Sequence, residues 1–311
     1  MDWGQLWRIA TAPDNVPITA LLGLVPFYAW YGLRQAKAND RLITQLEASP
    51  EMAKTHHRKV QPYKTGWVKE VHTWPYLLRI ELLAVIIVTI VLMVWSITLN
   101  APLEEPSNPN LTMNPAKAPW YFLGLQEMLV YFDPWMAGVV LPSLIIVGLM
   151  VIPYIDSNPL GAGYYTYKQR KFAIWTFCVG FIGLWVLMVI IGTFIRGPGW
   201  MWFWPGTTWD PERLIFEVNR DLPDLFGLTS FWSKGIFGAV VMGGYAAAAG
   251  YGFHKLITRP GFNRKIYERM NIFQYVTMQA LLILMLLLPV KMLIRHLFRI
   301  KYIWITPWFN I

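Results

Sequence analysis

The run YLLRIELLAVIIVTIVLMVWSI, residues 76–97, decides the class of fold. It is almost wholly apolar, and its two charged residues, Arg79 and Glu81, stand near its start. About 20 such residues in helical form are enough to cross the hydrocarbon core of a bilayer. The run therefore predicts a transmembrane helix, with Arg79 and Glu81 close enough to one membrane surface to reach the headgroups or to pair with each other.

Further runs of the same character lie on both sides of it, at residues 16–33, 134–154, 172–194, 231–251 and 272–293. The composition agrees, because 55% of the chain is apolar and only 14% is charged, whereas a soluble domain has about 25% charged residues. Aromatic residues make up 16% of the chain, with 17 Trp among them, and such side chains gather at membrane interfaces. We predict an all-α, polytopic transmembrane helical protein with about six spans.

Cys178 is the single cysteine of the chain. One cysteine excludes an intrachain disulfide, a cysteine-based zinc site and an Fe–S cluster held by this chain alone. Its place inside an apolar run favours the role of a small buried hydrophobic residue. The sequence also has no glycine-rich phosphate loop, nucleophile elbow or zinc helix motif, which disfavours a nucleotide-driven or hydrolytic enzyme.

The net charge of +9 reflects membrane topology, so no nucleic-acid partner is needed to explain it. Six crossings sort the loops into two sets, and most of the 27 Lys and Arg residues fall on one side, within residues 34–75, 155–171 and 252–271. The positive-inside rule makes this side cytoplasmic and places both termini outside. The basic tail from Arg295 to Lys301 departs from the rule, so either it docks on a partner subunit or one crossing is miscounted.

The first cytoplasmic segment, residues 34–75, mixes apolar and charged residues. Leu42, Ile43 and Leu46 stand among charges, and we expect a modest amphipathic surface helix over residues 41–53. The pair His56 and His57 follows it. In such a basic stretch a solvated or phospholipid-facing role is favoured over contact with a quinone or metal.

The outer loop between the second and third spans, residues 100–133, has two halves. Four prolines exclude a helix from the first half and favour an extended covering segment, namely Pro102, Pro106, Pro109 and Pro115. From Pro119 the pattern changes to a short helix whose apolar face contains Leu123, Leu125, Met128 and Leu129. The polar exceptions are Gln126, Glu127 and Asp133. We expect a wedge that lies at the outer membrane surface.

This loop resembles a segment of the cytochrome b/b6 family. Pro119-Trp120-Tyr121-Phe122-Leu123, with its flanking spans and Asp133-Pro134, is similar to the C-terminal half of that family, as in subunit IV of cytochrome b6f and the matching domain of cytochrome bc complexes. Members have a Pro-Glu-Trp-Tyr motif at the outer quinol-oxidation pocket. The resemblance covers about residues 76–209, and Gly192-Thr-Phe-Ile-Arg-Gly-Pro-Gly-Trp200 resembles the exit of the family's next helix.

The chain departs from the family at the motif glutamate, because Pro119 stands where the family has that acid. By resemblance, the missing glutamate would accept a proton as quinol is oxidised, and proline cannot do this. The nearest substitute is Glu127, about two turns along the same short helix, and we predict it as the catalytic acid. Other outer-side acids are Glu104, Glu105 and Asp133. Pro119, Trp120, Tyr121 and Phe122 are the predicted quinol-binding residues, although the aromatic pair could equally anchor the wedge.

The resemblance also implies cofactors on other chains. The family's b haems need pairs of histidines within helices, but the histidines here lie in the cytoplasmic segment or near span ends, at His56, His57, His72, His254 and His296. We expect no metal or haem ligated by this chain, quinol at the subunit interface, and b haems and a Rieske Fe–S cluster on partner subunits. The expected partners are a cytochrome b6-like haem subunit, a Rieske iron–sulfur protein, a c-type cytochrome and the lipid bilayer.

We therefore predict a subunit of a bacterial bc-type quinol:cytochrome c oxidoreductase in the cytoplasmic membrane. The chain alone is not expected to be active. We divide the chain into residues 1–75, an N-terminal span and basic segment; residues 76–209, the subunit IV-like domain; and residues 210–311, two additional spans and a tail. The alternatives are a non-catalytic assembly subunit of a membrane redox complex and, less favoured, a transporter. The quinol type, the electron acceptor and the subunit composition are not encoded in any recognisable motif.

Overall fold

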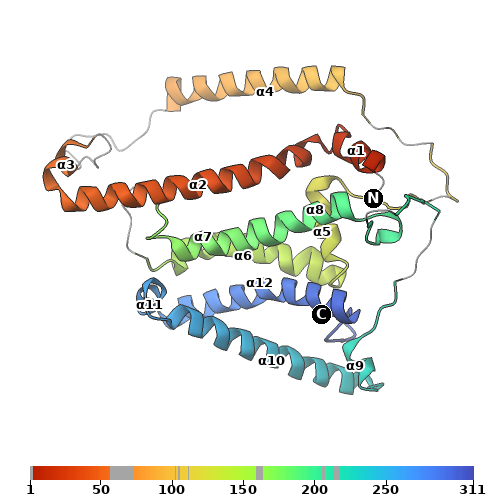
Figure 1. Cartoon of the computed structure of the whole chain (residues 1–311). Coiled ribbons are helices and arrows are strands. Elements are labelled where there is room, and N and C mark those ends of the chain that lie inside the picture. Colours follow the sequence, from red (N-terminus) through yellow and green to blue (C-terminus); the bar gives the residue numbers. More distant parts are fainter. Residues whose placement is uncertain are drawn as a thin grey trace. The chain divides into compact units, whose positions relative to one another are not determined.

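The structure, a computed structural model, describes residues 3–56, 73–101, 103, 106–110, 112–158, 164–204, 207–212 and 217–311. The chain forms two compact units. One comprises Met1–Leu6, Leu111–Leu160 and Gln169–Ile311, and the other comprises Trp7–Asn110 and Gly161–Lys168. The described residues are built from helices joined by loops and a few isolated β-bridges (Figure 1). The predicted all-α class is confirmed.

Six helices of the described chain are long and apolar enough to cross a membrane, and they coincide with the six predicted runs. They are α2 (Val16–Ala48), α4 (Leu78–Thr98) with the preceding turn η1 (Thr73–Leu77), η2 (Met136–Val140) with α6 (Leu141–Ile155), the continuous stretch α7 (Lys171–Phe177), η3 (Cys178–Val186), α8 (Leu187–Ile190) and η4 (Ile191–Ile195), α10 (Phe231–Thr258), and α12 (Ile272–Phe298). Shorter helices complete the chain, namely α1 (Trp3–Thr11), α3 (Pro50–Thr55), α5 (Trp120–Met128), η5 (Pro198–Trp200), α9 (Leu222–Leu225) and α11 (Phe262–Tyr267).

In the unit of Trp7–Asn110, helix α2 is much longer than the predicted span. It continues from the apolar run to Ala48, and the separate surface helix expected over residues 41–53 is wrong, because α2 absorbs its first part and α3 its end. The residues after Gly32 include several Ala, Leu, Gln and Arg, which are good helix formers. The helix ends only where Pro50 follows, since a proline disfavours helical backbone in the residue before it.

The polar half of α2 is fixed by the segment 164–168 of the same unit. The carboxylate of Asp40 accepts hydrogen bonds from the Lys168 backbone N–H at 3.0 and 3.2 Å. The Asn39 amide donates to the Tyr165 carbonyl at 2.9 Å, and Ala36 beside them is fully buried. His56 contacts the Tyr164 hydroxyl at 3.2 Å, whereas His57 and His72 lie outside the described residues.

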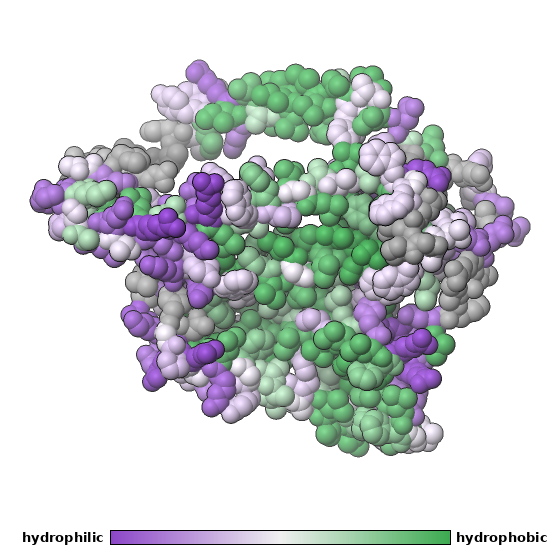
Figure 2. All heavy atoms as spheres, viewed as in Figure 1, coloured by the Kyte–Doolittle hydropathy of each residue, from purple (hydrophilic) through white to green (hydrophobic). Residues whose placement is uncertain are grey.

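Helix α4 is exposed along its whole length. Figure 2 shows that apolar side chains cover it, and Ile80, Leu82 and Val85 are each more than half exposed. Burial of apolar surface is the main driving force of folding in water, so a helix of this kind requires lipid or another subunit around it. This agrees with the predicted transmembrane role.

The unit of Leu111–Leu160 and Gln169–Ile311 has a core where α5, α6, α8 and α12 meet. Met128, Tyr131, Phe132, Met188 and Leu287 are its centre. Helix α5 lies against α8 and η4, and glycines allow this close approach: a Cβ on Gly124 would meet Val189 at 3.2 Å and one on Gly192 would meet Leu123 at 3.2 Å. The predicted short helix after Pro119 is therefore a packed element of the core.

The basic tail folds back on its own chain. Arg295 is 4% exposed and forms an ion pair with Glu217, and Lys291 is fully buried and donates a hydrogen bond to the Lys301 carbonyl. Six candidate spans are found in the described part of the chain, which agrees with the predicted number of crossings. Among the described residues, the Nε and Nη1 atoms of Arg295 are buried without a hydrogen-bond partner, so the pair with Glu217 satisfies this side chain only in part. Lys234 forms an ion pair with Asp224 at 2.6 Å.

Candidate functional site

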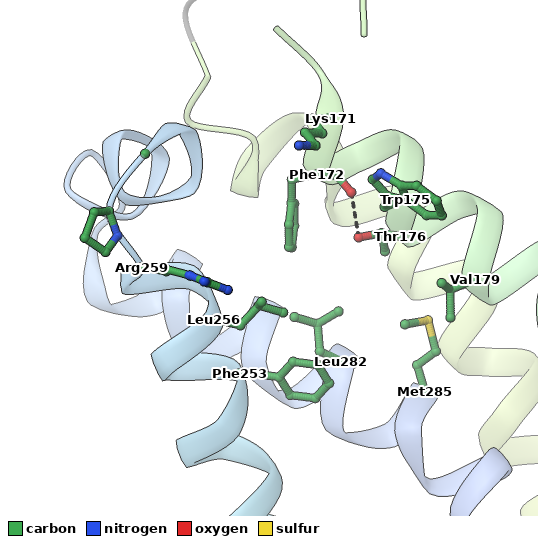
Figure 3. A pocket seen from close by; sticks show the side chains of 12 residues that line it. Lys171, Phe172, Trp175, Thr176, Val179, Phe253, Leu256, Arg259, Leu282 and Met285 are labelled. Atoms are coloured by element: carbon green, nitrogen blue, oxygen red, sulfur yellow. Dashed lines mark hydrogen bonds between the residues drawn. The ribbon is translucent and has the colours of Figure 1, made fainter. Parts of the chain in front are cut away.

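A cavity of about 680 Å³ lies at one end of the larger unit, between the start of α7 and the end of α10 (Figure 3). Lys171, Phe172, Phe253 and Arg259 are among its lining residues. None of the predicted site residues lines it. The predicted residues lie on and around α5, which packs on the opposite end of the same membrane helix, at α8 and η4.

Helix α5 begins where the sequence predicts, at the proline. Pro119 precedes the first helical residue, Trp120, and its carbonyl accepts the Phe122 N–H at 2.8 Å. Gln126 fixes the approaching loop, because its side chain accepts from the Ala118 N–H at 2.8 Å and donates to the Ala116 carbonyl at 2.7 Å. The loop and the helix are thus one rigid corner.

Three consecutive aromatic rings stand at this corner. The centroids of Trp120 and Tyr121 are 5.7 Å apart, and those of Tyr121 and Phe122 are 4.8 Å apart. Tyr121 and Phe122 are 53% and 52% exposed. Large apolar rings left uncovered in this way mark a surface that receives lipid, a ligand or another protein.

Glu127, in contrast, is fully buried at the other end of α5. Its two carboxylate oxygens accept hydrogen bonds from Arg196, at 3.0 Å from Nε and 2.6 Å from Nη2. Tyr131 Oη donates to Oε1 at 2.8 Å, and the Trp200 indole N–H donates to Oε2 at 3.1 Å. Such bidentate pairing with several donors stabilises a buried carboxylate.

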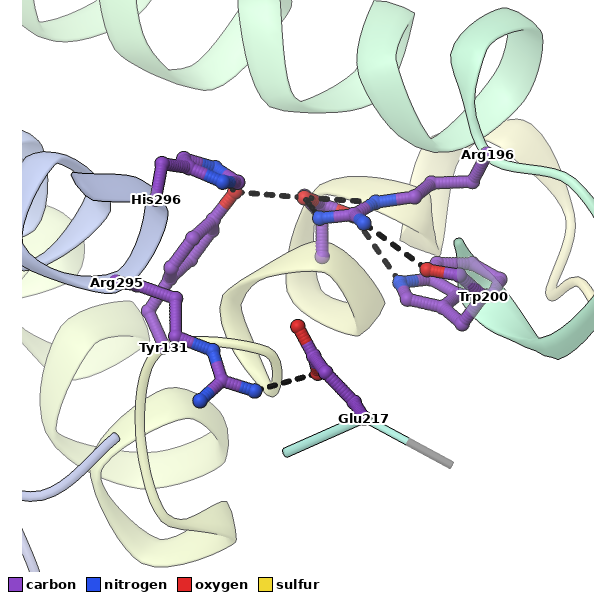
Figure 4. Close-up of polar contacts among 7 residues, drawn as sticks. Tyr131, Arg196, Trp200, Glu217, Arg295 and His296 are labelled. Atoms are coloured by element: carbon purple, nitrogen blue, oxygen red, sulfur yellow. Dashed lines mark hydrogen bonds and ion pairs between the residues drawn. The ribbon is translucent and has the colours of Figure 1, made fainter. Parts of the chain in front are cut away.

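Arg196 is held in place by the loop that follows η4 (Figure 4). Its Nη1 donates to the Trp200 carbonyl at 2.9 Å, and the guanidinium lies 4.6 Å from the centroid of the Trp202 ring. Gly199, in the left-handed region at φ 67°, permits the tight turn between them. Burial alone would lower the pKa of Arg196, but its hydrogen bond with Glu127 and the charge of Glu127 raise it.

Tyr131 extends the network to α12. Its hydroxyl lies 3.1 Å from His296 Nε2, and the Trp202 ring lies tilted by 58° against that histidine, with 5.1 Å between the ring centroids. Burial raises the pKa of the Tyr131 phenol well above its ordinary value, and the neighbouring charge of Glu127 adds to the effect. The phenol is therefore protonated and links a carboxylate to an imidazole.

A second cation lies close to the pair. Lys117 Nζ donates to the Thr193 carbonyl at 2.9 Å and lies 5.8 Å from the Trp209 ring centroid. Burial lowers the pKa of Lys117 to about 8; the charge of Glu127 opposes this shift and that of Arg196 adds to it. Glu127 is thus the acid in a site with one buried cation, Arg196, and one partly buried cation, Lys117.

The remaining outer acids are placed differently. Asp133 accepts the Trp135 N–H at 2.9 Å, as expected at the start of a helix, and Glu104 and Glu105 lie outside the described residues. Sequence reasoning missed Arg196, Tyr131 and His296 as partners of Glu127. The sequence contained one indication. Arg196 lies in the segment Gly192–Trp200 at the predicted outer end of a span, and the loop predicted on the same side has Glu127 as the single acid of its apolar helix.

The fold and this corner define a multi-pass α-helical membrane protein with a short packed helix in the loop between its second and third spans. Residues 106–196 match the family model described as cytochrome b(C-terminal)/b6/petD, so this part of the chain is similar to that family. The predicted resemblance is confirmed over a shorter range than residues 76–209. No curated protein and no solved structure matches the chain. The match supports a subunit of a cytochrome bc/b6f-type redox complex.

Proposed function

We propose that the chain forms part of the outer quinol-oxidation pocket in a quinol:cytochrome c oxidoreductase of the bacterial cytoplasmic membrane. The observation that supports this proposal is the aromatic corner of Trp120, Tyr121 and Phe122, with Tyr121 and Phe122 exposed, inside the matched range and where the sequence resemblance puts the family's motif. Rings of this kind can lie against a quinol head and exclude water from it. The pocket would be completed by a partner subunit, which would cover the exposed rings.

The cofactors belong to partner subunits in this proposal. The b haems and a Rieske cluster would take the electrons from quinol. In this chain, His254 contacts the Tyr275 hydroxyl at 2.8 Å and His296 contacts Tyr131, so both are engaged in hydrogen bonds between side chains. The chain itself would supply the shape of the pocket, exclusion of water and a route for protons.

Glu127 would be the proton acceptor on that route. A hydrogen-bonded chain runs from Glu127 through the Tyr131 hydroxyl to His296, with distances of 2.8 and 3.1 Å. The carboxylate forms an ion pair with Arg196, so a proton from quinol would have to replace part of that ion pair. This requirement predicts a proton-transfer step that depends on both Glu127 and Arg196.

The purified complex with Glu127→Gln tests the role of the acid. We expect quinol turnover to fall by about 10²-fold or more, with a changed dependence on pH, because an amide accepts no proton. Asp133→Asn is the matched control, since it neutralises another outer acid of the same loop, and it should keep the wild-type profile. Unchanged turnover of Glu127→Gln over the whole pH range would remove Glu127 from the mechanism.

The aromatic corner is tested separately by Phe122→Ala, which should weaken competition by inhibitors of the outer pocket. Leu129→Ala, also exposed and just after α5, is its control.

A second candidate function is a non-catalytic assembly subunit of the same kind of complex. The observation that favours it is the closed environment of Glu127, which is fully buried and has Arg196, Tyr131 and Trp200 as partners, while Pro119 replaces the motif acid. Under this alternative, Glu127→Gln lowers the yield or thermal stability of the complex, but the assembled fraction turns over quinol at the wild-type rate at every pH.

A further inference from the structure

The cavity between α7 and α10 has a shape and lining that no step of quinol oxidation uses. Its walls are mostly apolar, with Phe172, Val179, Phe253 and Met285 among them. Figure 3 shows Lys171 at one end and Arg259 pointing into the cavity, while Val179 and Met285 lie away from Lys171. At about 680 Å³ it is in the range of cavities that bind ligands.

The two cations lie at one membrane surface. Lys171 is the first residue of the membrane helix Lys171–Ile195, and Arg259 follows directly on Thr258, the last residue of α10. These two spans are consecutive and cross in opposite directions, so the start of the first and the end of the second reach the same side. Val179 lies about 12 Å further along the helix toward the bilayer centre. The cavity is therefore polar at headgroup depth and apolar below it.

Two acids near the mouth pair with cations that do not line the cavity. Arg170 pairs with Asp156 at 2.5 Å, and Arg264 pairs with Glu268 at 2.9 Å, so these two acids do not neutralise Arg259. Within the described residues Arg259 forms no ion pair. A cation held over an apolar cavity attracts an anionic head with an apolar tail.

We propose that this cavity binds one anionic phospholipid. Its phosphate would lie between Lys171 and Arg259, and one acyl chain would lie along Phe172, Val179 and Met285. The two cations select an anionic headgroup over a zwitterionic one, and the apolar wall selects a lipid over free phosphate. The proposal does not depend on quinol chemistry, because its residues are separate from α5 and its partners.

Native mass spectrometry of the purified complex tests the site, with phosphatidylglycerol or phosphatidylcholine of identical acyl chains added in nonionic detergent. We expect the wild-type complex to retain one phosphatidylglycerol that the Lys171→Gln/Arg259→Gln variant binds at least about tenfold more weakly. The matched control is Lys255→Gln/Arg264→Gln, which removes the same charge at the same surface. Lys255 lies over the Tyr251 ring and Arg264 pairs with Glu268, so this control should retain the lipid.

Val179→Trp fills the cavity without changing its charge, and it should abolish the same binding event. Phosphatidylcholine and inorganic phosphate should give no difference between any of these proteins. Equal retention of phosphatidylglycerol and phosphatidylcholine by the wild-type complex would overturn the proposal, as would a loss in Lys171→Gln/Arg259→Gln no greater than in the control. If that variant does not assemble, the lipid comparison on the wild-type protein and Val179→Trp decide the matter.

Discussion

At the scale of single residues, the chain depends on one buried ion pair. Glu127 and Arg196 have side chains that are 0% and 3% exposed, and their nearest atoms are 2.6 Å apart. Breaking such a pair leaves a charge in a medium of low polarity, and this typically costs about 3–5 kcal/mol. The net contribution of the intact pair is smaller, because both charges lost their hydration on folding.

Arg196→Met should therefore lower the stability of the chain by about 3–5 kcal/mol, because Glu127 would keep only Tyr131 and Trp200 as donors. Thermal unfolding of the purified complex measures the change. Arg264→Met is the comparison, since its pair with Glu268 is more than half exposed and should contribute less than about 1 kcal/mol. Equal shifts in the two variants would show that burial of the first pair has no energetic consequence.

At the scale of elements, glycines in α10 have two different roles. A Cβ on Gly238 would lie 2.6 Å from the Trp304 Cα and 2.8 Å from its Cβ, so the C-terminal segment packs directly on the helix backbone there. Gly243 and Gly244 have nothing within 4 Å of that position. The small residues of α10 are thus in contact with the rest of the chain only in part, since Gly250 faces Ile283 of α12.

We expect Gly238→Ala to destabilise the chain by about 1–3 kcal/mol, because Trp304 backbone must move to admit the methyl group. Gly243→Ala adds the same methyl group to open space on the same helix, and it should be neutral or gain about 0.5–1 kcal/mol from helix propensity. Thermal unfolding followed by tryptophan fluorescence compares the two. A Gly238→Ala protein as stable as Gly243→Ala would contradict the packing of the tail on α10.

At the scale of the whole molecule, the alternation of loops determines which surface each site faces. Six crossings would place residues 155–171 and 252–271 on one side and the α5 loop on the other. By the positive-inside rule, we expect the basic side to be cytoplasmic. The aromatic corner would then lie outside, where the released protons must go, and the phospholipid cavity would lie inside.

The single cysteine makes this topology testable. In a Cys178→Ser background, Asp210→Cys should react with a membrane-impermeant maleimide in right-side-out spheroplasts. Lys168→Cys should react only after the membrane is permeabilised, because its loop follows the third span. The opposite labelling pattern would place the aromatic corner in the cytoplasm and exclude an outer quinol pocket.

Much of the architecture follows from local sequence. Runs of apolar residues long enough to cross a bilayer satisfy their own backbone hydrogen bonds only as helices, so the spans are set without reference to the rest of the chain. The same is true of α5, because Pro119 can start a helix and the apolar residues after it give one face. The extension of α2 to Ala48 was missed, since propensity there outweighs the change from apolar to polar residues.

The environment of Glu127 was decided only by tertiary structure. Residues 127 and 196 are brought together by packing of α5 on α8 and η4 through Gly124 and Gly192, and no local pattern encodes that contact. The same holds for Arg295, which pairs with Glu217, and for Lys291, which donates a hydrogen bond to the Lys301 carbonyl. The length of an apolar run is a property of one segment, whereas the partner of a buried charge depends on which distant segment the fold places beside it.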